Sequence, residues 1–405
     1  MYHGSDPMNT PSRRTLLKTL PAGLALSGPA RAADGKLKIT RFVLHKMTLR
    51  WRDLLFVEIH TDGGLIGLGE GSLHTRVEIV EQAIKWLEPH LVGLDPAGVE
   101  DHWDRMYYRL TRWRGGPSLV SALSAVDMAL WDLEGKRLGV PVWRLLGGPI
   151  HSRLRVYYTH WNNTMRENSP QAFAERAIQT REKGWTAVKW AIPRAQSETE
   201  RIESAIQRVA AVRKAGGPHF DICLELFESL TTRSAIRFAE AMAPYKPMFI
   251  EEPLARENPA AFTELAAKSA VPIATGEGLL SRYEFRQLLE AKGAAIVQPD
   301  VMHCGGITEM RKIANLAETY GVELAPHQCG GPVGHVASLA AASVCRNFLI
   351  HEWEADDDAL FQELTGGKYP VQKNGVVALP EGPGLGLTVN FAELKKRFPF
   401  KTLTS

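Results

Sequence analysis

Apolar residues recur in two different patterns along this chain, and the pattern changes near residue 150. Before that point, strand-like segments cover 37–47 and 53–71, and the second contains an Asp-Gly-Gly turn that is typical of a hairpin. Helical periodicity then covers 76–91 and 118–139. Strands followed by helices predict an α+β domain, which we place at residues 34–152.

A different alternation follows, in which short apolar segments are separated by longer helix-like segments. The eight predicted strands cover 154–159, 186–191, 220–225, 247–251, 271–276, 294–299, 322–326 and 347–351. Their spacing of about 25 residues predicts βαβ units that close into a barrel. We therefore predict an α/β barrel over 153–353 and a polar, Gly-rich segment over 354–405 that returns to the first domain.

The N-terminal segment has the arrangement of residues that is typical of an export signal. Arg13 and Arg14 precede a short apolar stretch, and small residues follow at 30–33. The paired arginines favour the route that exports folded proteins. We expect residues 1–33 to be a twin-arginine-type signal peptide and the protein to be periplasmic; a disordered basic tail is the alternative. The apolar stretch is too short for a permanent anchor, so we expect no stable membrane insertion.

Composition and charge add little to this picture. The 405 residues are 44% hydrophobic and 23% charged, which is ordinary for a globular protein. A net charge of +3, with no long run of Lys and Arg, gives no reason to expect a nucleic-acid partner. The four cysteines have no CxxC spacing, and we interpret them all as buried thiols; they are Cys223, Cys304, Cys329 and Cys345.

Carboxylates follow three successive predicted strands. The interval is 26 residues from Glu225 to Glu251 and again from Glu251 to Glu277. The carboxyl ends of barrel strands point into one mouth, so these side chains should converge. Three carboxylates in one place repel each other unless a cation joins them, and an all-oxygen ligand set favours Mg²⁺. We choose Glu251 over Glu252 because it comes first after the apolar run.

The ends of other predicted strands carry groups that can transfer a proton or supply positive charge. Asp300 and His327 follow neighbouring strands, and a carboxylate beside an imidazole fixes its tautomer and raises its basicity. Lys189 follows an earlier strand, where it can act as a base or supply positive charge, and we favour the electrostatic role. A divalent metal, a cation and a His–Asp pair together suit removal of a proton next to a carboxylate, because the metal stabilises the enediolate that forms.

Four stretches carry a resemblance to a known family, namely 114–148, 247–254, 272–309 and 324–332. In them the chain resembles the enolase superfamily, in the mandelate racemase/muconate lactonizing enzyme branch, and is most similar to sugar-acid dehydratases of the D-galactonate dehydratase type. The resemblance implies a modified TIM barrel, (β/α)₇β, under an N-terminal α+β capping domain, and a homo-oligomer. It implies Mg²⁺ on the three glutamates, a His327–Asp300 catalytic dyad, and a hydrogen bond from Glu352 to the substrate carboxylate.

The same resemblance implies that loops of the capping domain select the substrate. We place these loops at His45–Arg52 and Tyr107–Gly116, and expect Arg114 to contact the substrate. His160 and Trp161, at the end of the first barrel strand, offer an alternative acid or a face for sugar stacking. Packing at the barrel mouth is the structural alternative for this pair.

Two positions depart from the relatives. Racemase-type members have Lys-x-Lys where this chain has Lys189-Trp190-Ala191, and Ala191 takes no proton. Galactonate dehydratases have Asp-x-His where this chain has Glu225-Leu226-Phe227, so their acid for the departing hydroxyl is missing. D-galactonate dehydration itself is therefore not the expected reaction.

These departures leave a Mg²⁺-dependent dehydratase of another acid sugar as the predicted function. His327 would take the α-proton and return a proton to the leaving group on the same face. One alternative is a cycloisomerase or epimerase acting on a sugar acid or its lactone. Another is a catalytically silent protein that binds acidic sugars, although a binder needs no base.

Overall fold

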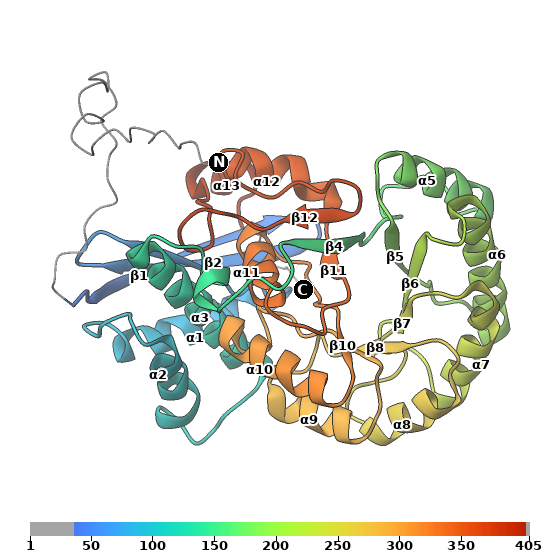
Figure 1. The fold of residues 1–405 in the computed structure, drawn as a ribbon, viewed down its shortest axis with the longest axis horizontal. Helices are drawn as coiled ribbons and strands as arrows, with labels where there is room; N and C mark the ends of the chain where they lie inside the picture. The colour runs from blue at the N-terminus through green and yellow to red at the C-terminus, as the bar shows by residue number, and fades with distance from the viewer. Residues whose placement is uncertain (1–35, 402–405) are drawn as a thin grey trace, which may run out of the picture. The chain divides into compact units, whose positions relative to one another are not determined.

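The computed structural model describes residues 36–401, and the predicted signal peptide at 1–33 lies outside this range. A ring of eight parallel strands forms the centre of the fold (Figure 1). The strands follow chain order from β4 to β10, and β11 pairs with β4. Hydrogen bonds of 2.8 Å join Leu324 of β10 to Asn347 and Leu349, just before β11, and close the ring. The strands are β4 (Arg153–Tyr158), β5 (Ala187–Ala191), β6 (Asp221–Glu225), β7 (Phe249–Glu251), β8 (Ile273–Thr275), β9 (Ile296–Val297), β10 (Glu323–Leu324) and β11 (His351–Trp353).

Seven helices connect these strands in order and lie around the outside of the ring (Figure 1). They are α5 (Pro170–Glu182), α6 (Glu198–Gly216), α7 (Thr232–Met242), α8 (Pro259–Lys268), α9 (Arg282–Glu290), α10 (Gly306–Thr319) and α11 (Pro332–Ala342). Seven strand–helix units and a final strand are the predicted (β/α)₇β barrel, so the fold class is confirmed.

The N-terminal part forms an antiparallel sheet of three strands, β1 (Ile39–Leu49), β2 (Arg52–Thr61) and β3 (Ile66–Glu70). Its helices are α1 (Val77–Leu87), α2 (Val99–Asp104), α3 (Pro117–Leu138) and the short α4 (Val142–Leu145). Helix α3 packs on β3, where Gly69 has no room for a side chain because an added Cβ would meet the Ala125 carbonyl at 1.8 Å. The helix ends as predicted at Gly139, whose φ of 70° favours glycine.

The C-terminal segment contacts both parts of the molecule. It contains α12 (Asp358–Leu364), β12 (Val376–Ala378) and α13 (Phe391–Arg397). Strand β12 pairs antiparallel with the start of β4. Farther on, Phe391 stacks on His45 of β1 at 3.9 Å between ring centroids, and Lys401 N–H donates to Thr48 Oγ1. No helix within residues 36–401 is long and apolar enough to cross a membrane.

The last barrel strand differs most from its predicted bounds. The prediction ended it at residue 351, whereas the ladder with β4 runs over 351–353. A polar His was taken as the end of an apolar run. In the structure His351 is fully buried, and its imidazole contacts the Ser338 hydroxyl at 2.8 Å, so its polar ring is satisfied inside the fold.

The inside of the ring has an apolar floor to which each strand contributes one side chain. The set is Tyr157, Ala187, Cys223, Phe249, Ala274, Ile296, Ala325 and Ile350. Side chains two residues apart on a strand share a face, so the next inward positions lie one layer toward the carboxyl ends. They include Lys189, Glu225, Glu251, Gln298, His327 and Glu352. Alternation along the strands thus places a polar layer on an apolar floor.

Candidate active site

The three predicted metal-binding glutamates come together at the ends of β6, β7 and β8. One carboxylate oxygen from each of Glu225, Glu251 and Glu277 lies within 4.8 Å of the other two. Glu225 and Glu251 are buried, and Glu277 is half-buried at the cavity. Burial and the charge of Glu251 raise the pKa of Glu225 well above its usual value, and burial raises that of Glu277. Acidic groups this close favour a shared cation.

Lys189 from β5 lies beside the same carboxylates. Its ammonium forms ion pairs with Glu251 and, at 2.8 Å, with Glu352 Oε1, while Glu225 Oε2 lies at 3.9 Å. Burial alone would lower the pKa of Lys189, but the charges of Glu251 and Glu352 raise it well above its usual value. A lysine held in this way stays protonated, which fits the electrostatic role better than that of a base.

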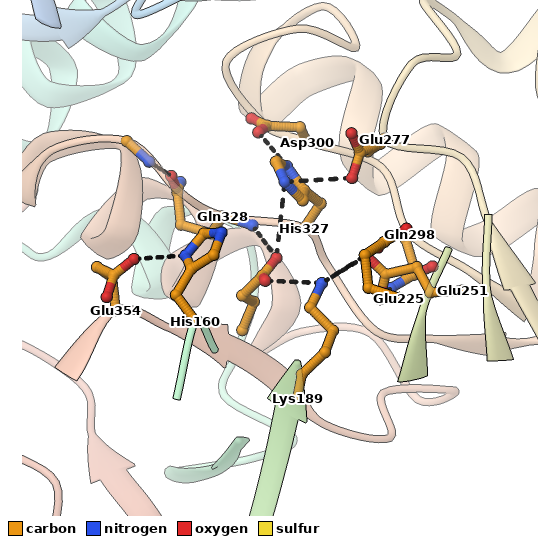
Figure 2. A network of polar contacts seen from close by, with 12 residues as sticks. His160, Lys189, Glu225, Glu251, Glu277, Gln298, Asp300, His327, Gln328 and Glu354 are labelled. Atoms are coloured by element: carbon orange, nitrogen blue, oxygen red, sulfur yellow. Dashed lines mark hydrogen bonds and ion pairs between the residues drawn. The ribbon is translucent and has the colours of Figure 1, made fainter. Parts of the chain in front are cut away.

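His327 and Asp300 form the predicted pair on the other side of the carboxylates (Figure 2). His327 Nδ1 is 2.7 Å from Asp300 Oδ2, and Asp300 also accepts the Met302 N–H. Burial alone would raise the pKa of Asp300, but contacts with His303 and His327 bring it below its usual value. An ionised Asp300 accepts a hydrogen bond from Nδ1–H, so Nε2 carries the free lone pair when the imidazole is neutral.

The remaining nitrogen of His327 faces the metal-binding side of the site. Nε2 lies 3.3 Å from Glu277 Oε2 and 3.8 Å from Glu352 Oε2. Burial lowers the pKa of His327, but the charges of Glu277 and Glu352 and the hydrogen bond to Asp300 together raise it well above its usual value. A cation bound to Glu277 would offset this shift. Glu352 is itself held by the Gln328 N–H at 2.9 Å and by Lys189, and its pKa is lowered.

These groups open into one cavity of about 630 Å³ between the barrel mouth and the N-terminal sheet. Barrel residues that line it include Lys189, Glu225, Glu277, Asp300, His327 and Glu352. The N-terminal part contributes residues 51–54, residues 72–76 and Pro117. The cavity is large enough for a small organic ligand. Acid–base groups therefore share one cavity with the candidate cation site.

Two predicted residues have different surroundings from those expected. Trp161 is fully buried, packs against Trp190 and Phe173, and donates its indole N–H to Thr180 Oγ1 on α5. It has no face to offer a sugar, which corrects that prediction. Arg114 is exposed, lies over the Tyr108 ring and is absent from the cavity lining, so a contact between this residue and the substrate stays a prediction.

The cysteine prediction also needs one correction. The four thiols are free, and three of them are buried as expected. Cys329 is instead half-buried and lines the cavity two residues after His327. Burial raises its pKa to about 12, so the sulfur stays a thiol at neutral pH.

His160 does line the cavity, and its partner was not foreseen. Its Nδ1 lies 2.7 Å from Glu354 Oε2, and Glu354 is buried. The sequence held a signal for Glu354, which stands two residues after Glu352 and so at the same kind of position. Placing the end of the last strand at residue 351 hid that relation. Gln298, which donates to Glu251 Oε2 at 2.7 Å, was missed because an amide has no obvious catalytic role.

Phe227 occupies the position that the sequence marked as unusual. Its φ is 47°, an uncommon value for a bulky residue, and its N–H donates to Glu225 Oε1. The side chain is 55% exposed and lines the cavity, as does Ala191. Both positions thus face the cavity with groups that cannot donate or accept a proton.

Comparisons with known proteins agree with this geometry. Residues 32–147 match the mandelate racemase / muconate lactonizing enzyme N-terminal domain, and residues 172–394 match the enolase C-terminal domain-like family. A D-galactonate dehydratase from Ralstonia nicotianae is 36% identical over 367 residues, which are 89% of this chain and 94% of the relative.

Solved structures give the same result. A mandelate racemase/muconate lactonizing enzyme from Jannaschia sp. CCS1 superimposes with a TM-score of 0.83 at 32% identity, covering 90% of this chain and 98% of that one. An enolase-superfamily member from Salmonella Typhimurium has a TM-score of 0.81 at 30% identity, with 90% and 98% coverage. The chain therefore belongs to the enolase superfamily, in its mandelate racemase/muconate lactonizing enzyme branch, and is a dehydratase-like member of it.

Proposed function

We propose that this protein is a Mg²⁺-dependent hydro-lyase that removes water from an acid sugar, by taking the proton next to the carboxylate. The observation that carries the proposal is the position of His327. A carboxylate fixes one of its nitrogens, while the other lies in the cavity beside Glu277, one of the three convergent glutamates. The dehydratase names of the relatives support the same reaction class.

The residues present fit a hard divalent cation. Three carboxylates converge from three adjacent strand ends, and Glu225 Oε2 is buried without a hydrogen-bond partner among the described residues. Such an oxygen is costly unless something binds it. Glu225, Glu251 and Glu277 would hold Mg²⁺, since all three offer oxygen ligands. When bound, the ion supplies Lewis-acid stabilisation of negative charge on the substrate carboxylate.

His327 is the proposed base. Asp300 holds the Nδ1–H, so the Nε2 lone pair points toward the reacting carbon of a substrate whose carboxylate lies at the glutamates. Removal of the α-proton leaves an enediolate, and loss of the β-hydroxyl gives an enol that tautomerises to the 2-keto product. Atoms balance with the loss of one water, and no oxidant is needed.

Lys189 and Glu352 lie next to the position proposed for the substrate carboxylate. The Lys189 ammonium lies between Glu251 and Glu352 and partly neutralises a region crowded with carboxylates. Glu352 faces His327 Nε2 at 3.8 Å, close enough for a substrate oxygen to contact both.

A substrate screen tests the proposal directly. The purified protein is incubated with Mg²⁺ and a panel of aldonic, aldaric and uronic acids, and 2-keto acid formation is measured. We expect turnover of at least one acid that stops on addition of EDTA and returns with Mg²⁺. D-galactonate should be a poor substrate because Phe227 replaces the acid. The absence of product from every acid would overturn the dehydratase function.

The same screen, run in D₂O, separates elimination from epimerisation. An epimerase returns substrate that is inverted and deuterated at C2, without keto product. A dehydratase accumulates the 2-keto acid instead.

For export, we propose that residues 1–33 direct the protein to the periplasm, which cell fractionation with and without Arg13 and Arg14 would test.

A further inference from the structure

A second histidine–carboxylate pair lies beside the cavity, away from His327, and its histidine, His160, lines the cavity. His160 follows the end of β4, and its Nδ1 lies 2.7 Å from Glu354 Oε2, just after β11. The same distance joins His327 Nδ1 to Asp300 Oδ2. In Figure 2, His160 and Glu354 occupy one side of the group of polar side chains, and Glu225 and Glu251 occupy the other.

The pair is held rigidly. Glu354 is 2% exposed, and the buried guanidinium of Arg52 lies 3.8 Å from its Oε2. Trp51 contacts the His160 ring edge-on at 5.1 Å between centroids. His160 has a φ of 48°, a left-handed conformation that few side chains favour and that often marks functional positions.

The free nitrogen of His160 is available to a ligand. Because Nδ1 faces Glu354, Nε2 points away from it, and the side chain is 22% exposed at the cavity wall. Within residues 36–401, Nε2 has no hydrogen-bond partner. A carboxylate on Nδ1 fixes the orientation of the ring and leaves Nε2 for the ligand.

The proposed reaction needs a general acid, and the His160–Glu354 pair would supply it. A hydroxyl leaves a carbon atom readily only when it receives a proton, so an elimination needs an acid as well as a base. Ala191 and Phe227 line the cavity but carry no proton. The Lys189 ammonium is already bound by two carboxylates, and His303 contacts the Ser121 hydroxyl and Asp300.

We propose that His160, positioned by Glu354, is the general acid that protonates the departing β-hydroxyl. This inference rests on the dehydratase function proposed above. His327 takes the proton from C2, and the electrons of that C–H bond form the C2–C3 double bond. The C3–O bond breaks, its electrons stay with oxygen, and the proton on His160 Nε2 completes a water molecule. The base and the acid are thus two residues rather than His327 alone.

A substrate with a better leaving group tests the acid. The probe is the 3-deoxy-3-fluoro analogue of whichever sugar acid the wild-type protein dehydrates, because fluoride departs without a proton. His160→Asn suits the left-handed backbone, since Asn tolerates that conformation. We expect H160N to lose about 10²- to 10⁴-fold in kcat with the hydroxyl substrate. With the fluoro substrate, we expect it to stay within about 10-fold of wild type.

Two variants serve as controls. His74 also lines the cavity and contacts Trp51 edge-on at 5.6 Å, and H74N should not change the ratio of fluoro to hydroxyl turnover. H327N should lose both reactions, because both need the base. If H160N lost the same fraction of kcat on both substrates, or none on either, the proposed role of His160 would be overturned, whereas the dehydratase function would stand. No product from the wild-type protein would overturn the dehydratase function and this inference together.

Discussion

The two histidine–carboxylate pairs share a distance but differ in what holds them. His327 and Asp300 both come from the barrel, next to the proposed metal-binding glutamates. His160 and Glu354 stand at the ends of β4 and β11, and Trp51 and Arg52 of the N-terminal part support them. The barrel alone therefore builds the proposed base. The proposed acid depends on the N-terminal part, the same part that encloses the cavity above it.

This difference has a chemical meaning. Removal of a proton next to a carboxylate is the same step for any acid sugar, whereas the position of the departing hydroxyl varies with the substrate. Substitutions in the N-terminal segment 51–52 can alter the position of the acid that this segment supports. The base, which the barrel alone holds, then keeps its position. Phe227 stands where the resemblance to galactonate dehydratases implies an acid, and it fits a chain in which that role belongs to another element.

The largest effect should follow from breaking the barrel pair. Asp300→Asn leaves an amide beside His327 Nδ1, which allows the proton to move to Nε2 and removes the basic lone pair. We expect kcat to fall by about 10³-fold with both the hydroxyl and the fluoro substrate. Steady-state kinetics measure this, and near-normal turnover of either substrate would mean that Asp300 does not orient the base.

A smaller and more selective effect should follow from replacing the carboxylate of the His160–Glu354 pair by an amide. Glu354→Gln keeps a hydrogen-bond acceptor for His160 but removes its negative charge. We expect kcat for the hydroxyl substrate to fall by about 10- to 100-fold, with little change in KM and little change for the fluoro substrate. A loss confined to KM would mean that Glu354 affects binding rather than the acid.

The smallest effect concerns stability away from both pairs. Asp127 of α3 is fully buried and accepts hydrogen bonds from the N–H and Oγ1 of Thr308 on α10, which follows Asp300 in the chain. Burial raises its pKa to about 7 from an ordinary value near 4. A raised folded-state pKa contributes stability that is present below about pH 4 and is lost as the pH rises toward 7.

Denaturant unfolding of wild type and D127N at several pH values checks this point. The difference in unfolding free energy between the two proteins should change with pH by up to about 1.4 kcal/mol per unit between pH 4 and 7, in the direction that weakens wild type. It should be flat outside that window. A constant difference across the range would mean that Asp127 is already ionised in the folded protein at pH 4.

Much of the barrel and its polar layer could be predicted from the sequence, because strand alternation and barrel closure are regular. Glu225, Glu251, Glu277 and His327 stand at strand ends, and one geometric rule brings them together. Helix α3 was predicted within one residue at each end, because Gly139 provides a clear stop.

Residues beyond the strands could not be placed in the same way. Once a strand ends, the chain turns according to local contacts, so His160 reaches the cavity while the adjacent Trp161 enters the core against α5. Arg52 and Glu354 are about 300 residues apart in the sequence, and no period relates them. Their pairing depends on how the N-terminal sheet lies over the barrel, which no segment encodes alone.

The central claim is that His327 takes the proton and His160 gives one. NMR in D₂O measures both steps at once, as deuterium entry at C2 of the recovered substrate and as formation of the 2-keto product. The claim predicts that H160N exchanges the C2 proton while forming almost no product, and that H327N does neither. Wild-type rates of product formation in H160N, C2 exchange in H327N, or loss of both steps in H160N would contradict it.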